Sequence, residues 1–189
     1  SRVTLSTGSA GRFRSAIDNG GVVRIIEHGA TILATGAKPA GYYQDGYRRH
    51  DSVMTQLELE QRLADGELDA TTLSSVAMVL CSGSREEPRN YCSRICCSQA
   101  LKNILSLRRK NHNLAIHVFY RDIMTYGFLE EYYTQARREG VIFLRYSPDN
   151  KPKVAFRNEL PVVTCHDPVL QRDVAVRADI LVLTPGLEP

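Results

Sequence analysis

The fold and chemistry of this chain are both decided by residues 81–97, which read CSGSREEPRNYCSRICC. Four of the chain's five cysteines lie in these 17 residues, with the spacing C-x10-C-x3-C-C. The apolar run Ser75–Leu80 leads into the first cysteine, and the pattern of Ser98–Leu107 predicts a helix after the last. The thiols are therefore expected at a corner between a strand and a helix, where α/β folds usually hold phosphates or cofactors.

Soft thiolates gathered at one corner indicate a metal centre, and four of them suit an iron–sulfur cluster or zinc. If Cys92 precedes the first helical turn, then Cys92, Cys96 and Cys97 can converge above the helix N-terminus, and Cys81 completes the set. Structural zinc sites usually carry two C-x2–4-C knuckles, and two such knuckles are not found in this sequence. Adjacent Cys96 and Cys97 suit separate iron corners better than one tetrahedral ion. We therefore favour a [4Fe–4S] cluster, with zinc or metal-free thiols as alternatives.

The surroundings of the cysteines also suit an anionic cluster. The N-terminus of a helix favours negative charge because its first N–H groups are free and its dipole is positive there. Arg85, Arg89 and Arg94 lie among the cysteines and can offset further charge or donate to sulfur.

From Leu73 onward, predicted strands alternate with helices. Strands Val76–Leu80, Ala115–Tyr120 and Val141–Leu144 are separated by a helix ending near Lys110 and a second over Gly127–Glu139. This order predicts an α/β fold with a parallel, right-handed, Rossmann-like sheet. The remaining apolar segments predict an added β meander followed by a returning parallel strand: Lys153–Phe156, Leu160–Cys165, Val174–Arg177 and Ile180–Leu183.

The first 70 residues differ in character. Residues 1–36 look like a β segment, with strands Val3–Ser6, Phe13–Ile17 and Val22–Glu27 and then a buried parallel strand over Gly29–Ala37. Residues 37–70 predict a crossover loop and a helix over Asp51–Leu63 that ends at Gly66, and residues 71–189 form the cysteine-bearing domain. The missing initiator Met and the strand-like start suggest a fragment of a longer polypeptide.

Several other functions are disfavoured. A nucleotide-binding Rossmann unit would carry Gly-x-Gly-x-x-Gly after its first strand, but only Gly83 is present, which argues against NAD(P)H. Arg121-Asp122, at a strand end, is better interpreted as a structural ion pair than as a ribose contact. Cys165-His166 is better interpreted as packing than as a ligand pair.

The composition is ordinary for a globular protein, with 43% hydrophobic and 24% charged residues and a net charge of +3. The basic residues are scattered, so we expect no nucleic acid partner. No apolar run reaches the 18 residues of a membrane-spanning helix, and no signal peptide is found. Clustered cysteines in such a chain indicate metal binding rather than disulfides, which is consistent with a cytoplasmic location.

The cysteine motif, followed by FYRDIMTYG at residues 119–127, resembles the A subunit of CoB–CoM heterodisulfide reductase and its relatives among quinone-interacting oxidoreductase subunits. The resemblance covers the chain from Gly29 onward. It implies a pyridine-nucleotide-disulfide-oxidoreductase architecture like that of thioredoxin reductase. There, an FAD domain is interrupted by a smaller domain that lacks functional NAD binding and carries a [4Fe–4S] cluster. By the same resemblance, residues 1–36 are a remnant of the FAD domain, and the cluster ligands are Cys81, Cys92, Cys96 and Cys97.

The resemblance also implies that FAD lies near Ala34, Thr35, Gly36 and Lys102. The family's Gly-x-Gly-x-x-Gly FAD loop and ferredoxin-type cluster motifs are not found in this sequence, so the isolated chain is expected to bind FAD poorly and to be inactive. The implied function is an oxidoreductase subunit that relays electrons between FAD and the cluster. Its partners would be other iron–sulfur subunits of a reductase or hydrogenase complex, and homodimer formation is left open. The rival hypotheses are a zinc-stapled interaction domain and a thiol oxidoreductase, which needs a thiol of depressed pKa.

Overall fold

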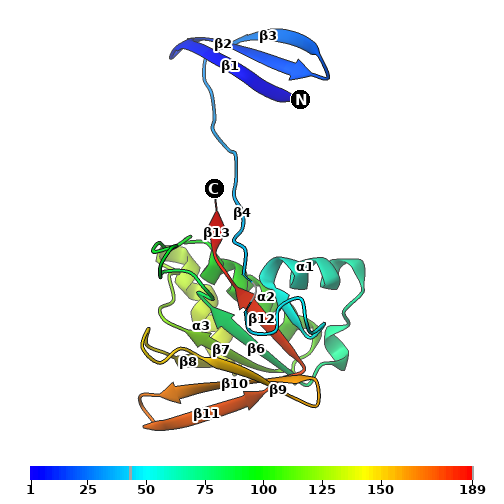
Figure 1. Cartoon of the computed structure of the whole chain (residues 1–189), viewed down its shortest axis with the longest axis vertical. Helices are drawn as coiled ribbons and strands as arrows, with labels where there is room; N and C mark the ends of the chain where they lie inside the picture. Colours follow the sequence, from blue (N-terminus) through cyan, green and yellow to red (C-terminus); the bar gives the residue numbers. More distant parts are fainter. Residues whose placement is uncertain (43, 189) are drawn as a thin grey trace. The chain divides into compact units, whose positions relative to one another are not determined.

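The computed structural model describes residues 1–42 and 44–188, which divide into two compact units, Ser1–Ala37 and Lys38–Glu188. The first unit is an antiparallel meander of β1 (Arg2–Ser9), β2 (Arg12–Asn19) and β3 (Val22–His28) (Figure 1). Gly20 and Gly21 both have positive φ in the turn between β2 and β3, which side chains rarely tolerate. The predicted three-stranded meander and its Asn-Gly-Gly turn are thus confirmed.

The predicted buried strand over Gly29–Ala37 is wrong. Residues 30–37 have no regular structure, and the side chains of Ile32 and Leu33 are 89% and 86% exposed. A buried parallel strand needs a hydrogen-bonded neighbour on each side and cover on both faces. Within residues 1–42 and 44–188, no strand pairs with this segment, so its apolar composition alone does not make it a strand.

The second unit is built on a five-stranded sheet in which all strands run parallel. Its order is β5 (Val53–Thr55), β12 (Ile180–Thr184), β6 (Ser75–Leu80), β7 (Ala115–Tyr120) and β8 (Ile142–Arg145). The central strands β6 and β12 are almost entirely buried, as expected for a sheet covered on both faces. The predicted Rossmann-like sheet and its returning strand are confirmed.

Helices cover one face of this sheet and a meander covers the other (Figure 1). The helices are α1 (Gln56–Asp65), α2 (Cys96–Lys110) and α3 (Glu130–Arg138), with short 3₁₀ turns η1 (Ala70–Thr72) and η2 (Gly127–Leu129). The meander consists of β9 (Lys153–Arg157), β10 (Leu160–Asp167) and β11 (Arg172–Arg177). The short strands β4 (Lys38–Pro39) and β13 (Leu187–Glu188) pair antiparallel.

Two hydrophobic cores result from the alternation of side chains along the strands. Met78 of β6 packs toward the helices with Ile104 of α2, whereas Val79 packs toward the meander with Phe119 and Val163. None of the described helices is long and apolar enough to cross a membrane.

The boundaries of two predicted helices are corrected. The helix expected from Asp51 begins only at Gln56, because Val53–Thr55 pairs with β12 as an edge strand. Thr55 then starts the helix through a capping box with Glu58. The helix expected over Gly127–Glu139 is divided into η2 and α3.

Replacing Thr55 with alanine should lower the free energy of unfolding by about 1 kcal/mol, because the hydroxyl that accepts from the Glu58 N–H at 3.3 Å is lost. Urea denaturation measures the change. Thr55→Ser keeps the hydroxyl and is the matched control. An equal loss in both variants would show that the hydroxyl does not stabilise the helix start.

Candidate metal centre

Cys81 lies directly after the central strand β6, where a nucleotide-binding fold carries its first glycine. Its φ is +59°, in the left-handed region, so the chain turns sharply away from the sheet at this residue. The Ser82 hydroxyl donates to the Val79 carbonyl at 3.0 Å, and the Ser82 N–H donates to the Thr184 carbonyl at 3.1 Å. These bonds hold the corner against β12, and so the Cys81 thiol has a defined position.

The loop between Cys81 and Cys92 is held in place by Arg89. The Arg89 guanidinium donates to the Gly83 carbonyl at 2.9 and 3.1 Å and to the Gly41 carbonyl at 3.1 Å. It also forms an ion pair with Glu188 of β13 at 2.9 Å. One side chain therefore ties the middle of the cysteine loop to two segments distant in the sequence.

Further bonds hold the end of this loop against β13. The Tyr91 hydroxyl donates to the Leu187 carbonyl at 2.9 Å, and the Leu187 N–H donates to the Ser93 hydroxyl at 2.8 Å. The first bond lies just before Cys92 and the second just after it. The position of Cys92 is therefore set by β13 as well as by its own loop.

Cys96 and Cys97 are the first two residues of α2, so the helix begins two residues earlier than the pattern of Ser98–Leu107 predicted. In the described chain, no side chain caps the helix at Ile95, and so a ligand is a suitable partner for the free N–H groups of the first turn. Cys97 is buried, and its thiol donates to the Asp122 carbonyl at 3.8 Å. Cys92 accepts from the Arg94 N–H at 3.3 Å.

The structure brings the four motif thiols into one region. The thiols of Cys81, Cys92 and Cys96 all lie near enough to Cys97 that negative charge on any of them raises its pKa. Over residues 1–42 and 44–188, no three Cys, His, Asp or Glu side chains are grouped closely enough to hold a single metal ion. The thiols are neighbours, but they are not drawn together around one point.

Burial dominates the acidity of these thiols. It raises the pKa of Cys81 and Cys96, and it raises the pKa of Cys97 from 9.0 to about 11. Arg85 opposes the shift at Cys81 through charge and hydrogen bonding, and Ser93 opposes it at Cys96. These three thiols are thus protonated at neutral pH, and a metal that binds them must displace protons.

Asp122 forms ion pairs with Arg85 at 2.9 Å and Arg145 at 3.3 Å, rather than with its neighbour Arg121. Arg121 was expected to pair with Asp122, but its guanidinium donates to the Arg85 carbonyl at 2.9 Å. Both residues of the Arg121-Asp122 pair therefore contact Arg85.

Cys165 belongs to a different layer of the structure. It lies on β10 and is 5% exposed in the core between the sheet and the meander, as the packing interpretation predicted. The four motif cysteines lie at the start of α2 and in the loop before it, and Cys81 and Cys97 contact the helix-side core.

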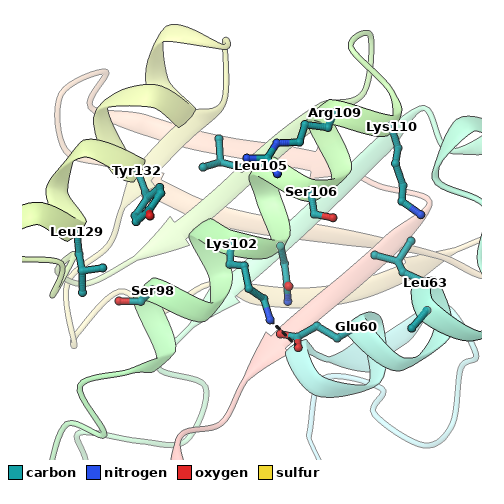
Figure 2. A pocket seen from close by; sticks show the side chains of 12 residues that line it. Glu60, Leu63, Ser98, Lys102, Leu105, Ser106, Arg109, Lys110, Leu129 and Tyr132 are labelled. Carbon is teal, nitrogen blue, oxygen red and sulfur yellow. Dashed lines mark ion pairs between the residues drawn. The ribbon is translucent and has the colours of Figure 1, made fainter.

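Lys102 lies in a cavity of about 620 Å³ bounded by α1, α2 and the η2–α3 segment (Figure 2). Its ammonium group forms an ion pair with Glu60 of α1 at 2.7 Å, and Leu105 and Tyr132 line the wall. Ala34, Thr35 and Gly36, the other residues expected near FAD, belong to the first unit and are exposed in its irregular segment.

Two residues near the thiols were missed by sequence reasoning. Tyr146 is 5% exposed, donates from its hydroxyl to the Leu80 carbonyl at 2.6 Å and lies within charge range of Cys81. The Ser93 hydroxyl accepts a hydrogen bond from the Leu187 N–H of β13, and Ser93 lies beside Cys96. Neither residue carried a sequence signal for these contacts, because each contact joins segments that only the folded chain brings together.

No family model matches the chain. It is 33% identical over 181 residues to the A subunit of the H2:CoB–CoM heterodisulfide, ferredoxin reductase of Methanothermobacter marburgensis, covering 87% of this chain and 27% of the relative. It is also 33% identical over 157 residues to the iron-sulfur A subunit of the CoB–CoM heterodisulfide reductase of Methanocaldococcus jannaschii, covering 76% and 24%. The chain is therefore similar to a segment of heterodisulfide reductase A subunits. The resemblance inferred from the cysteine motif is thus confirmed.

The chain spans about a quarter of the length of those relatives. Its fold is similar to that of Lactococcus lactis thioredoxin reductase, with a TM-score of 0.51 and 13% identity over 100% of this chain and 53% of the other. It is also similar to a NAD-dependent persulfide reductase from A. fulgidus, with a TM-score of 0.51 and 14% identity over 98% and 31%. These likenesses confirm the predicted fold class.

The chain without bound metal should lose stability as the pH rises from about 9 to about 11. Burial raises the pKa of Cys97 from 9.0 to about 11, so across this window the folded state retains a proton that the unfolded state has released. Urea denaturation in the presence of a reductant measures the loss. Cys97→Ala should weaken the pH dependence, and an unchanged dependence in this variant would contradict the assignment to Cys97.

Replacing Gly83 with alanine should disturb the cysteine loop. Gly83 has φ +64°, and a Cβ there would lie 2.7 Å from the Tyr42 ring. Gly66→Ala is the matched control, because Gly66 has φ +75° and its added Cβ meets no described atom within 4 Å. Both variants should lose about 1–2 kcal/mol of unfolding free energy from the left-handed backbone. Only G83A should also lose metal loading, measured as iron per chain after anaerobic reconstitution.

Proposed function

We propose that Cys81, Cys92, Cys96 and Cys97 hold a [4Fe–4S] cluster, and that the intact protein relays electrons between this site and FAD. The observation that carries the proposal is the gathering of four thiols at the start of α2, a helix that no described side chain caps. The relative from M. jannaschii is named an iron-sulfur subunit, which supports the proposal. When bound, such a cluster supplies one-electron transfer.

The chain's own residues would bind the cluster and balance its charge. Thiolates are the ligands of iron–sulfur clusters, and the N–H groups at the start of α2 favour an anion. Arg85 adds a cation next to Cys81. Burial of Cys97 keeps water from one side of the site, while Cys92 and Cys96 are only partly buried.

The proposed flavin contact follows from the position of Lys102 on the same helix. Lys102 lies five residues, or about one and a half turns, after Cys97 on α2. A flavin that contacts Lys102 would therefore lie a short distance from the cluster. We propose other iron–sulfur subunits of a reductase or hydrogenase complex as partners, since the relatives are named as subunits of such enzymes.

The two rival functions make different demands on the thiols. A thiol oxidoreductase needs a depressed thiol pKa, whereas burial raises the pKa of Cys81, Cys96 and Cys97. This direction argues against a nucleophilic role for these three thiols. A zinc-stapled interaction domain would use the same four cysteines, and so it is the second candidate.

Anaerobic reconstitution with iron and sulfide tests the proposal. We expect about four irons per chain and a brown protein with broad absorption, because four thiolates suit a [4Fe–4S] cluster. Serine at Cys81, Cys92, Cys96 or Cys97 should lower the iron content, whereas Cys165→Ala should retain it because Cys165 packs in the other core. Stoichiometric zinc in the colourless protein, with no uptake of iron, would support the zinc-stapled domain instead.

A further inference from the structure

The two ends of the cysteine motif meet at the loop that follows β7. The Asp122 carbonyl lies 3.8 Å from the Cys97 thiol, and the Asp122 carboxylate forms an ion pair with Arg85 at 2.9 Å. Arg85 in turn lies close enough to the Cys81 thiol that its positive charge opposes the rise in the pKa of that thiol. A single residue of this loop therefore contacts one candidate ligand directly and a second candidate ligand through Arg85.

Arg85 is held in this place from several directions. Its backbone has φ +62°, a conformation that non-glycine residues keep only where the surroundings enforce it. Its N–H donates to the Arg89 carbonyl at 2.8 Å, and its carbonyl accepts from the Arg121 guanidinium at 2.9 Å. Its side chain is 23% exposed. The guanidinium is therefore a fixed charge rather than a mobile surface group.

We propose that Arg85 sets the reduction potential of the metal centre, as a fixed cation and N–H donor beside the Cys81 sulfur, with Asp122 as its positioning residue. This inference rests on the proposed cluster function. Adding an electron to a thiolate-ligated cluster makes the site more negative, and a nearby cation stabilises that reduced state. Hydrogen bonds to the sulfurs and net charge are among the factors that set such potentials.

The other two arginines of the motif, Arg89 and Arg94, have different surroundings from Arg85. The Arg89 guanidinium donates hydrogen bonds to two carbonyls and forms an ion pair with Glu188, and so it stabilises the loop. The Arg94 side chain is exposed, and water screens its charge. Asp122 also pairs with Arg145, so its negative charge is shared and does not simply cancel that of Arg85.

The test is a redox titration of the reconstituted protein with dithionite, followed by electron paramagnetic resonance. Arg85→Gln should shift the reduction potential to a more negative value than in the wild-type protein. Arg94→Gln removes the same charge from the same motif and should give a smaller shift. Arg85→Lys should fall between wild type and R85Q, because lysine keeps the charge but not the planar fork that reaches both Cys81 and Asp122.

The outcomes separate this inference from the function on which it rests. A wild-type protein that binds no iron would overturn the proposed function itself. A wild-type protein that loads iron, with equal potentials for R85Q and R94Q, would overturn the role of Arg85 alone. If R85Q fails to load iron, the reduction potential of R85K is compared with that of R94Q. A potential more negative in R85K than in R94Q supports the inference. A potential in R85K that is no more negative than in R94Q overturns it.

Discussion

The parallel pairing of β6 between β12 and β7 is the constraint on which the cysteine corner depends. This pairing buries β6 completely from Val76 to Leu80, so the chain must leave the sheet at Cys81. The bond from Ser82 to Thr184 exists only because β12 lies beside β6. The same β12 leads directly into β13, whose residues hold the loop around Cys92. The geometry of the site is thus set by a strand from the far end of the sequence.

The site combines two opposing electrostatic requirements. Burial disfavours thiolates and raises the pKa of three of the four motif cysteines, Cys81, Cys96 and Cys97. The first turn of α2 and Arg85 favour negative charge at the same place. A cluster that brings iron would satisfy both requirements, because the metal compensates the thiolates while the protein supplies the remaining positive charge.

The extent to which the sequence predicts the structure varies with how local the deciding interaction is. The strand β6, the helix α2 and the meander β9 to β11 were all predicted, because hydrophobic periodicity and turn residues specify them within short stretches. The segment Gly29–Ala37 and the start of α1 were predicted wrongly. In both cases strand pairing decides the outcome: the first segment has no described partner, and the residues before α1 gain one in β12.

For the candidate site, the sequence by itself determined which residues bear the chemistry. The spacing of Cys81, Cys92, Cys96 and Cys97, between a buried strand and a helix, already indicates a thiol site at the helix start. Only the tertiary structure decided how that site is held and charged. The ion pair of Arg89 with Glu188 of β13 holds the loop, and the ion pair of Asp122 with Arg85 holds the cation. The physical reason is that hydrogen bonds and ion pairs act over a few ångströms, so contacts between residues distant in the chain form only once the sheet has brought them together.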